Sequence, residues 1–241
     1  MTSSRISIMD IVFPRRCPLC NEIVIPKEEK ACKQCVEKLP VITGSRCKRC
    51  SKPIELEEQE YCFDCIKSTR HYEKGFSAFL YEGSIKKSLM DYKFRGLKQY
   101  AEFYTEQMIF HIGSELRKLK VDCIIPVPLH NRKMRMRGFN QAELLARGAS
   151  EFLGSPLIND ILIRTKYTIP QKKLDDKERL HNLLQAFTTI KEKEFQIIDK
   201  KILIIDDIYT TGSTIEACAD VLLKAGCRSV YFATVCIGKG F

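Results

Sequence analysis

Short apolar runs bounded by turn residues predict buried strands in the later part of the chain. Four segments have this pattern: 76–81, 121–127, 201–205 and 230–237. Between them apolar residues recur at helical spacing, through Ile85, Leu89 and Tyr92 and then within 97–119, 139–153 and 213–225. Strands that alternate with helices indicate βαβ units. The pattern therefore predicts an α/β fold, a mostly parallel sheet flanked by helices.

Cysteine dominates the segment that precedes these elements. Eight of the 12 cysteines form four C-x-x-C pairs, and the sequence CPLCNEIVIPKEEKACKQC is repeated in register by CKRCSKPIELEEQEYCFDC. Two such pairs supply the four sulfurs of a tetrahedral zinc shell, which leaves no open position for water and indicates a structural ion. The repeat favours one site at Cys17, Cys20, Cys32 and Cys35 and a second at Cys47, Cys50, Cys62 and Cys65, although an interleaved pairing fits the spacing too.

The polar stretch IKSTRHYEKG contains no cysteine and separates the two patterns. It predicts two domains, a double zinc ribbon over residues 1–70 and the α/β domain over 71–241. A ribbon of this size has too small a core to fold without its metal. We therefore interpret the zinc as stabilising this domain rather than as a sign of DNA binding.

Composition narrows the class of protein. With 44% hydrophobic and 29% charged residues, the 241-residue chain is ordinary globular material rather than disordered, collagenous or coiled-coil. No segment approaches the roughly 20 apolar residues of a membrane span, and residues 1–13 lack a signal-peptide cleavage site. We therefore expect a cytoplasmic protein without membrane insertion, in which cysteines bind metal rather than form disulfides.

The formal net charge is +10, and two four-thiolate zinc sites would lower it to about +6. This balance favours anionic partners, either a phosphorylated metabolite or a nucleic acid. Oligomeric state is not indicated by the sequence.

The segment KILIIDDIYTTGST combines a strand, two acids and a hydroxyl-rich turn before a helix. Backbone amides and hydroxyls at a helix N-terminus bind one phosphate. The adjacent carboxylates of Asp206 and Asp207 repel each other unless a cation or hydroxyl groups lie between them, which a sugar diol with Mg²⁺ would supply. Alternatively, the turn only caps the helix and the acids decorate it. Neither a Walker A loop nor a dinucleotide fingerprint is present.

This segment resembles the 5-phosphoribosyl 1-diphosphate (PRPP) motif of type I phosphoribosyltransferases. The strings KFRG at 93–96, PVPL at 126–129 and RGFNQAELLA at 137–146, with the cysteine-rich start, narrow the resemblance to the ComF family of competence proteins, over nearly the whole chain. Ser213 stands where a small residue such as Ala is frequent in the family.

The resemblance implies a type I phosphoribosyltransferase fold that binds PRPP, or a related ribose 5-phosphate compound, with Mg²⁺. It assigns the ribose hydroxyls to Asp206 and Asp207. The remaining implied phosphate-binding residues are Thr210, Thr211, Gly212, Ser213 and Thr214 for the 5′-phosphate and Val127, Pro128 and Leu129 near the pyrophosphate.

A basic run, Arg132, Lys133, Arg135 and Arg137, follows PVPL. Arginine grips a diphosphate bidentately, so we expect Arg132 and Arg137 to act with the two acids in catalysis, although such a run is also typical of a solvated face. The segment 164–187 corresponds to a mobile lid in the related transferases, or is a plain surface helix.

A competing hypothesis is a non-catalytic module of DNA uptake that binds single-stranded DNA or a competence helicase, with PRPP as a regulator or with no ligand. Cations interleaved with aromatic rings suit single strands. Those residues are Lys86, Lys87, Lys93, Arg95 and Lys98 with Tyr81, Tyr92 and Phe94. The same aromatics also suit the core-facing side of a helix, in which case no such surface exists.

Overall fold

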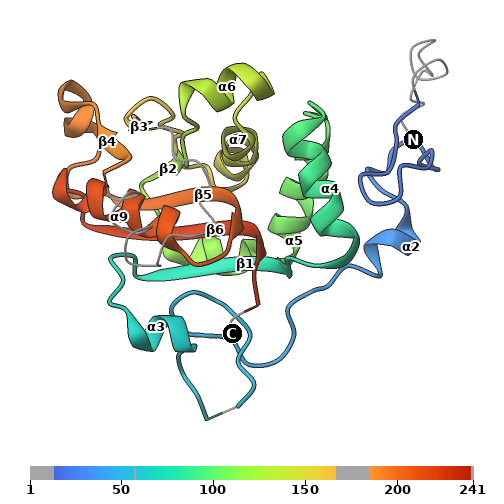
Figure 1. The fold of residues 1–241 in the computed structure, drawn as a ribbon, viewed down its shortest axis with the longest axis horizontal. Helices are drawn as coiled ribbons and strands as arrows, with labels where there is room; N and C mark the ends of the chain where they lie inside the picture. Colours follow the sequence, from blue (N-terminus) through green and yellow to red (C-terminus); the bar gives the residue numbers. More distant parts are fainter. Residues whose placement is uncertain (1–13, 57, 167–184, 240–241) are drawn as a thin grey trace.

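The structure, a computed structural model, describes residues 14–56, 58–166 and 185–239 (Figure 1). The helices are α2 (Lys33–Val36), α3 (Phe63–Lys67), α4 (Gly83–Phe94), α5 (Tyr100–Leu119), α6 (Asn131–Arg137), α7 (Gln141–Leu153), α9 (Ser213–Lys224) and the 3₁₀ helix η1 (Lys191–Gln196). The strands are β1 (Lys74–Leu80), β2 (Cys123–Pro126), β3 (Leu162–Arg164), β4 (Phe187–Thr189), β5 (Lys201–Tyr209) and β6 (Ser229–Ile237).

The central sheet has four strands in the order β1-β6-β5-β2, and every pair is parallel. Parallel neighbours need long crossover connections, which the intervening helices provide. Strands β3 and β4 form a separate antiparallel pair. In Figure 1 the pair lies beside one end of the sheet, next to α9.

Helices cover both faces of the sheet, and β5 shows how the sequence allows this. Leu203 and Ile205 belong to the core that contains α5 and α7 residues, whereas Ile202 and Ile204 belong to the core that contains α9 residues. Because consecutive strand residues point to opposite faces, a continuously apolar strand suits a sheet that is buried on both sides. The predicted α/β fold is confirmed.

The boundaries of two predicted elements were wrong. The strand predicted to end at Ile205 continues to Tyr209, so Asp206 and Asp207 lie within β5 rather than beyond it. Pairing with β6 continues through Asp206 to Tyr209, which keeps the backbone extended. The helix predicted from residue 97 begins at Tyr100, and a turn precedes it, in which the Tyr100 N–H donates to the Leu97 carbonyl at 3.0 Å. Strands β3 and β4 and helix α6 had not been predicted.

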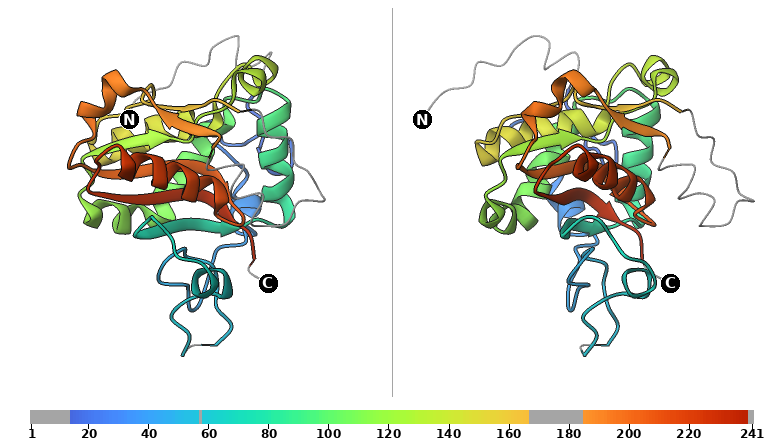
Figure 2. Two further views of the ribbon diagram at one scale, coloured as in Figure 1. Left: turned by 60° about the vertical axis from the view of Figure 1, so that its left-hand side comes forward. Right: turned by 90° about the vertical axis from the view of Figure 1, so that its left-hand side faces the viewer.

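The two cysteine repeats pack against different parts of the α/β fold. Cys17 and Val24 of the first repeat share a core with α4 and α5, and Lys30 forms ion pairs with Glu102 and Glu106 of α5. The second repeat projects from the edge of the sheet formed by β1, as both views of Figure 2 show around α3. Each repeat therefore stabilises its own region of the larger unit.

The chain between the repeats lies along β1. Val41 forms an antiparallel bridge with Phe79, and the Leu80 N–H donates to the Pro40 carbonyl at 2.8 Å. This segment covers a sheet edge that would otherwise expose unpaired backbone groups. Within the described residues, no helix has both the length and the apolar character that a bilayer crossing requires.

Candidate functional site

The eight paired cysteines form two groups of four, and in each group all sulfurs lie within 4.8 Å of one another. The Cys20 and Cys32 Sγ atoms are 3.8 Å apart, and those of Cys50 and Cys62 are 3.5 Å apart. A tetrahedral zinc ion with bonds of about 2.3 Å needs sulfur–sulfur edges of about 3.8 Å, so both groups fit zinc. The repeat-based pairing is confirmed, and the interleaved alternative is excluded.

The same turn builds both sites. The Asn21 N–H donates to the Cys17 carbonyl and the Ser51 N–H to the Cys47 carbonyl, each at 2.9 Å. Asn21 and Ser51 both have left-handed backbones, with φ of 67° and 71°. The second site has all four cysteines buried, whereas Cys20 of the first site is exposed. With four sulfurs each, these are structural zinc-binding sites.

The acid pair lies near the carboxyl end of β5. The Lys93 Nζ of α4 is 2.6 Å from the Asp207 Oδ2, and both side chains are largely buried. The Asp207 N–H donates to the Asp206 Oδ1 at 2.9 Å. Lys93 was predicted to belong to a possible DNA-binding surface, but its side chain is largely buried and contacts Asp207.

Burial raises the pKa of Asp206 to about 8, and the negative charge of Asp207 adds to that shift while Lys93 opposes it. Ionisation of the Asp206 carboxyl is therefore unfavourable unless a cation lies beside it. A carboxyl group with a strongly raised pKa indicates a candidate functional site. A cation bound beside it would lower that pKa again and release the proton.

Four cations from three elements surround the acids. Burial lowers the pKa of Lys133, and the charges of Arg164, Arg137 and Lys93 lower it further, while Asp206 opposes the shift. These cations come from α4, α6 and β3. A cluster of mutually repelling cations beside a carboxylate pair suits a ligand that carries both an anionic group and hydroxyls.

Arg137, predicted as a catalytic residue, lies in this cluster. Its guanidinium stacks 4.9 Å from the Phe94 ring centroid and donates to the Gln141 Oε1 at 2.8 Å. Burial lowers its pKa, against the opposing charges of Asp207 and Asp206. These contacts hold Arg137 at the acids.

Arg132, the other predicted cation, lies on the exposed side of α6, and its N–H donates to the His130 Nδ1 at 3.1 Å. Lys93 and Arg164 join the site although neither was predicted as a site residue. In the sequence, Lys93 is the first residue of the KFRG string and Arg164 is the first residue of the segment 164–187. Residues 167–184 of that segment lie outside the described residues.

Thr210, Thr211 and Gly212 connect β5 to α9, and Ser213 and Thr214 are the first two residues of that helix. Gly212 adopts a φ of 82° and is the N-cap residue of α9, where its missing side chain supplies no cap. The Thr211 and Ser213 hydroxyls lie 2.9 Å apart. First-turn amides of a 12-residue helix and clustered hydroxyls together suit a phosphate group.

The end of β2 lies beside this region because β2 pairs with β5. The Val127 N–H donates to the Ile205 carbonyl at 2.9 Å, directly before Asp206, and its carbonyl accepts from the Asn140 Nδ2 at 3.0 Å. Pro128 and Leu129 follow, half-buried. The parallel sheet thus gathers at one edge the elements that the sequence had placed far apart.

Comparison with known families defines the class of protein. A family model for the phosphoribosyl transferase domain matches residues 145–240, and one for the double zinc ribbon domain matches residues 8–66. Over these ranges the chain is similar to phosphoribosyl transferase domains and to double zinc ribbon domains. The chain is similar to curated competence and DNA utilization proteins.

Three of these relatives illustrate the similarity. Competence protein F of Haemophilus influenzae is 37% identical over 45% of this chain and 47% of its own length. DNA utilization protein YhgH of Escherichia coli strain K12 is 35% identical over 48% of this chain and 49% of its own. Competence protein ComFC of Bacillus subtilis is 28% identical over 84% and 82%. The match thus spans about half the length of the first two relatives.

Similarity to solved structures is limited. The purine phosphoribosyltransferase of Pyrococcus horikoshii overlaps 55% of this chain and 72% of its own, with 21% identity and a TM-score of 0.36.

Proposed function

We propose that the chain binds PRPP together with Mg²⁺ and transfers its phosphoribosyl group to an acceptor, with release of pyrophosphate. The observation that carries this proposal is the convergence, at one edge of the sheet, of the Thr210–Thr214 turn, the Asp206–Asp207 pair and the cations of α4, α6 and β3. These groups match, in order, a sugar phosphate, a ribose diol and a diphosphate.

In this proposal each group has one task. The turn amides and hydroxyls hold the 5′-phosphate, and Asp206 and Asp207 accept hydrogen bonds from the ribose hydroxyls. Arg137 and Lys133 stabilise the charge that develops on the pyrophosphate as its bond to C1 breaks, and Val127–Leu129 approach the same group. The acceptor forms the new bond to C1 of an oxocarbenium-like ribose and releases its proton to solvent.

Carboxylate oxygens are ligands that Mg²⁺ prefers, so Asp206 and Asp207 fit this ion when they are deprotonated. When bound with PRPP, Mg²⁺ would neutralise pyrophosphate charge. Arg137 packs against Phe94 and Gln141 near the acids, so we assign the binding of pyrophosphate to Arg137 first and to the exposed Arg132 second.

We also propose that the protein acts in DNA uptake during competence, which the names of two relatives support. In this view residues 1–70 form the zinc-bearing part and residues 71–241 the ligand-binding part. The protein would work in the cytoplasm, where PRPP is available.

Calorimetric titration of PRPP with Mg²⁺ tests the proposed ligand. Saturable binding is expected for the wild type and its loss for the double variant Asp206→Asn, Asp207→Asn. Asp160→Asn serves as the matched control, because Asp160 is an exposed aspartate that pairs with Lys193 instead. If a zinc-loaded, folded wild type shows no binding, the proposal is wrong. Pyrophosphate release with candidate acceptors then tests transfer.

One observation favours the non-catalytic alternative, a single-stranded DNA surface. Lys86, Lys87, Arg95 and Lys98 are exposed along α4 and the turn after it, and Phe94 is 56% exposed. Tyr92, in contrast, is buried, and Lys93 pairs with Asp207, so neither can contact DNA there. Oligonucleotide binding that weakens steeply with salt and with Lys86→Glu, Lys87→Glu would support this alternative.

A further inference from the structure

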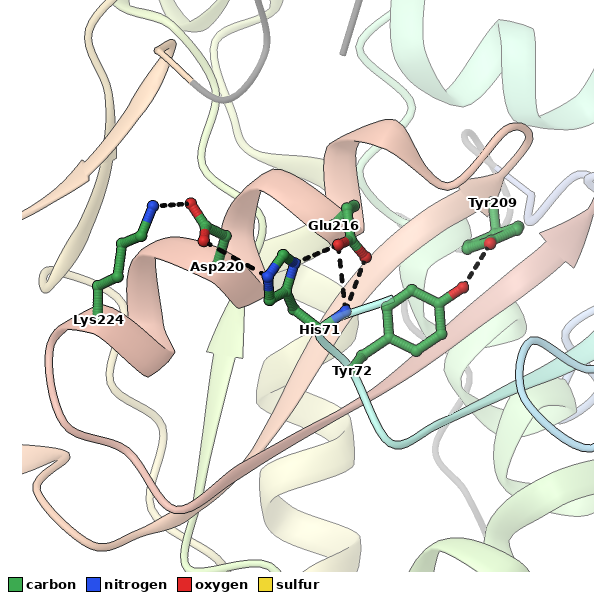
Figure 3. Close-up of polar contacts among 6 residues, drawn as sticks. All are labelled: His71, Tyr72, Tyr209, Glu216, Asp220 and Lys224. Atoms are coloured by element: carbon green, nitrogen blue, oxygen red, sulfur yellow. Dashed lines mark hydrogen bonds and ion pairs between the residues drawn. The ribbon is translucent and has the colours of Figure 1, made fainter. Parts of the chain in front are cut away.

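Three consecutive residues, Arg70, His71 and Tyr72, connect the second cysteine site to the turn between β5 and α9. Figure 3 shows the contacts of His71 and Tyr72. The Arg70 NH2 group donates to the Thr211 carbonyl at 3.3 Å. The His71 N–H donates to both carboxylate oxygens of Glu216, at 3.1 and 3.2 Å, and its Nδ1 also contacts that carboxylate. The chain that leaves the zinc site therefore binds residues within and just after the turn.

Tyr72 binds the residue before the turn. Its hydroxyl lies 2.7 Å from the Tyr209 hydroxyl, and both rings are buried. Tyr209 in turn supports Gly212, since a Cβ atom added there would lie 2.2 Å from the Tyr209 hydroxyl oxygen. The turn thus rests on a side chain that Tyr72 holds in place.

His71 extends these contacts along α9. Its Nε2 lies 3.8 Å from the Asp220 Oδ1, and Asp220 accepts from the Lys224 Nζ at 2.7 Å (Figure 3). Glu216 is only 3% exposed. A buried carboxylate without its donors would be costly, so His71 and α9 are held to each other.

The second zinc site packs against the same tyrosine. The Lys52 Nζ lies 5.9 Å from the centroid of the Tyr209 ring and 2.6 Å from the Asp64 Oδ2, and Lys52 is 3% exposed. All four cysteines of that site share one core with Tyr72 and Tyr209. The first zinc site belongs instead to the core of α4 and α5, on the other side of the sheet.

We propose that the second zinc site, and not the first, holds the phosphate-binding turn in its binding conformation, with Arg70, His71 and Tyr72 as positioning residues. The identity of the ligand rests on the proposed function, but the conformation of the turn does not. Loss of zinc from the second site would free residues 66–72 and, through them, Tyr209, Thr211 and Glu216.

The test compares Cys65→Ser with Cys35→Ser, the same position in the two repeats. Hydrogen exchange of the amides of residues 209–216, measured without ligand, reports the turn. Calorimetry with PRPP and Mg²⁺ reports binding, and a colorimetric chelator counts the zinc released. Exchange at the turn at least about tenfold faster, with a similar loss of affinity, is expected for Cys65→Ser alone. Equal effects of both variants, or an unchanged turn in Cys65→Ser, would overturn the proposal.

If Cys65→Ser does not fold, variants that keep both zinc ions decide the matter. Arg70→Ala and Tyr72→Phe should each speed exchange at residues 209–216, and Arg70→Lys should restore protection because Lys can still donate to the Thr211 carbonyl. A turn that exchanges as in the wild type in both Arg70→Ala and Tyr72→Phe contradicts the coupling. If the wild type does not bind PRPP, the proposed function is wrong. The coupling between the second zinc site and the turn is then tested by hydrogen exchange alone.

Discussion

Gly212→Ala perturbs the phosphate-binding turn at its most constrained position. The residue has a φ of 82°, a region that costs a residue with a Cβ about 1–2 kcal/mol. The added Cβ would also lie 2.2 Å from the hydroxyl oxygen and 2.6 Å from the Cζ of Tyr209, closer than real contacts allow. Overpacking of this kind costs about 1–3 kcal/mol. We expect the free energy of unfolding to fall by about 2–5 kcal/mol in total.

Gly154→Ala is the matched control. Gly154 has a φ of 69°, and nothing lies within 4 Å of its added Cβ, so only the backbone cost of about 1–2 kcal/mol remains. Urea unfolding of the zinc-loaded proteins measures both changes. The steric argument is refuted if the two variants lose the same stability.

A third variant identifies the atom in conflict. Tyr209→Phe in the Gly212→Ala background removes the nearest oxygen but leaves ring carbons at 2.6 and 2.9 Å from the added Cβ. Because Tyr209→Phe also removes the contact with the Tyr72 hydroxyl, Tyr209→Phe alone is the reference. Gly212→Ala should cost less stability in the Tyr209→Phe background than in the wild type, but should still cost some.

Four further predictions concern the acids, their lysine partner and the cysteines. Because the pKa of Asp206 is raised to about 8, the affinity for PRPP with Mg²⁺ should increase from about pH 7 to 9. Calorimetry measures this increase, and Asp206→Asn should abolish it. The same raised pKa gives stability that is present below about pH 4 and is lost as pH rises through about 8. Lys93→Met leaves the buried Asp207 carboxylate without its partner, so the free energy of unfolding in urea at pH 8 should fall by about 3–5 kcal/mol. The control is Arg95→Met, which breaks a solvent-exposed pair with Asp91 and should cost less than about 1 kcal/mol. Metal analysis should find two zinc ions per chain in the wild type and one in Cys20→Ser.

The zinc sites and the fold class could be predicted from the sequence. Four thiolate pairs at equal spacing leave few ways to complete a tetrahedral shell, and the repeat selects the pairing that the sulfur distances confirm. Strand and helix periodicity likewise reflect local geometry, so the parallel α/β fold was visible in the pattern. The acid–turn segment was also found from sequence, because strand, turn and helix follow one another without interruption.

Which distant residues meet at that segment depends on the packing of the whole chain. Lys93 and Arg164 reach the acids from other elements, and the charge pattern alone does not distinguish them from surface cations such as Lys86 or Arg132. Pairing with β6 decided that β5 extends beyond Ile205, since the acids themselves disfavour a strand.

The different roles of the two zinc sites were equally invisible in the sequence. The repeats are nearly equivalent in spacing, yet one packs against α5 and the other against Tyr209 beneath the phosphate turn. The spacing of the cysteines determines how each zinc ion is coordinated, because the four ligands lie close together in the sequence. What the metal site then supports depends on where the whole chain packs it, which is a property of the fold.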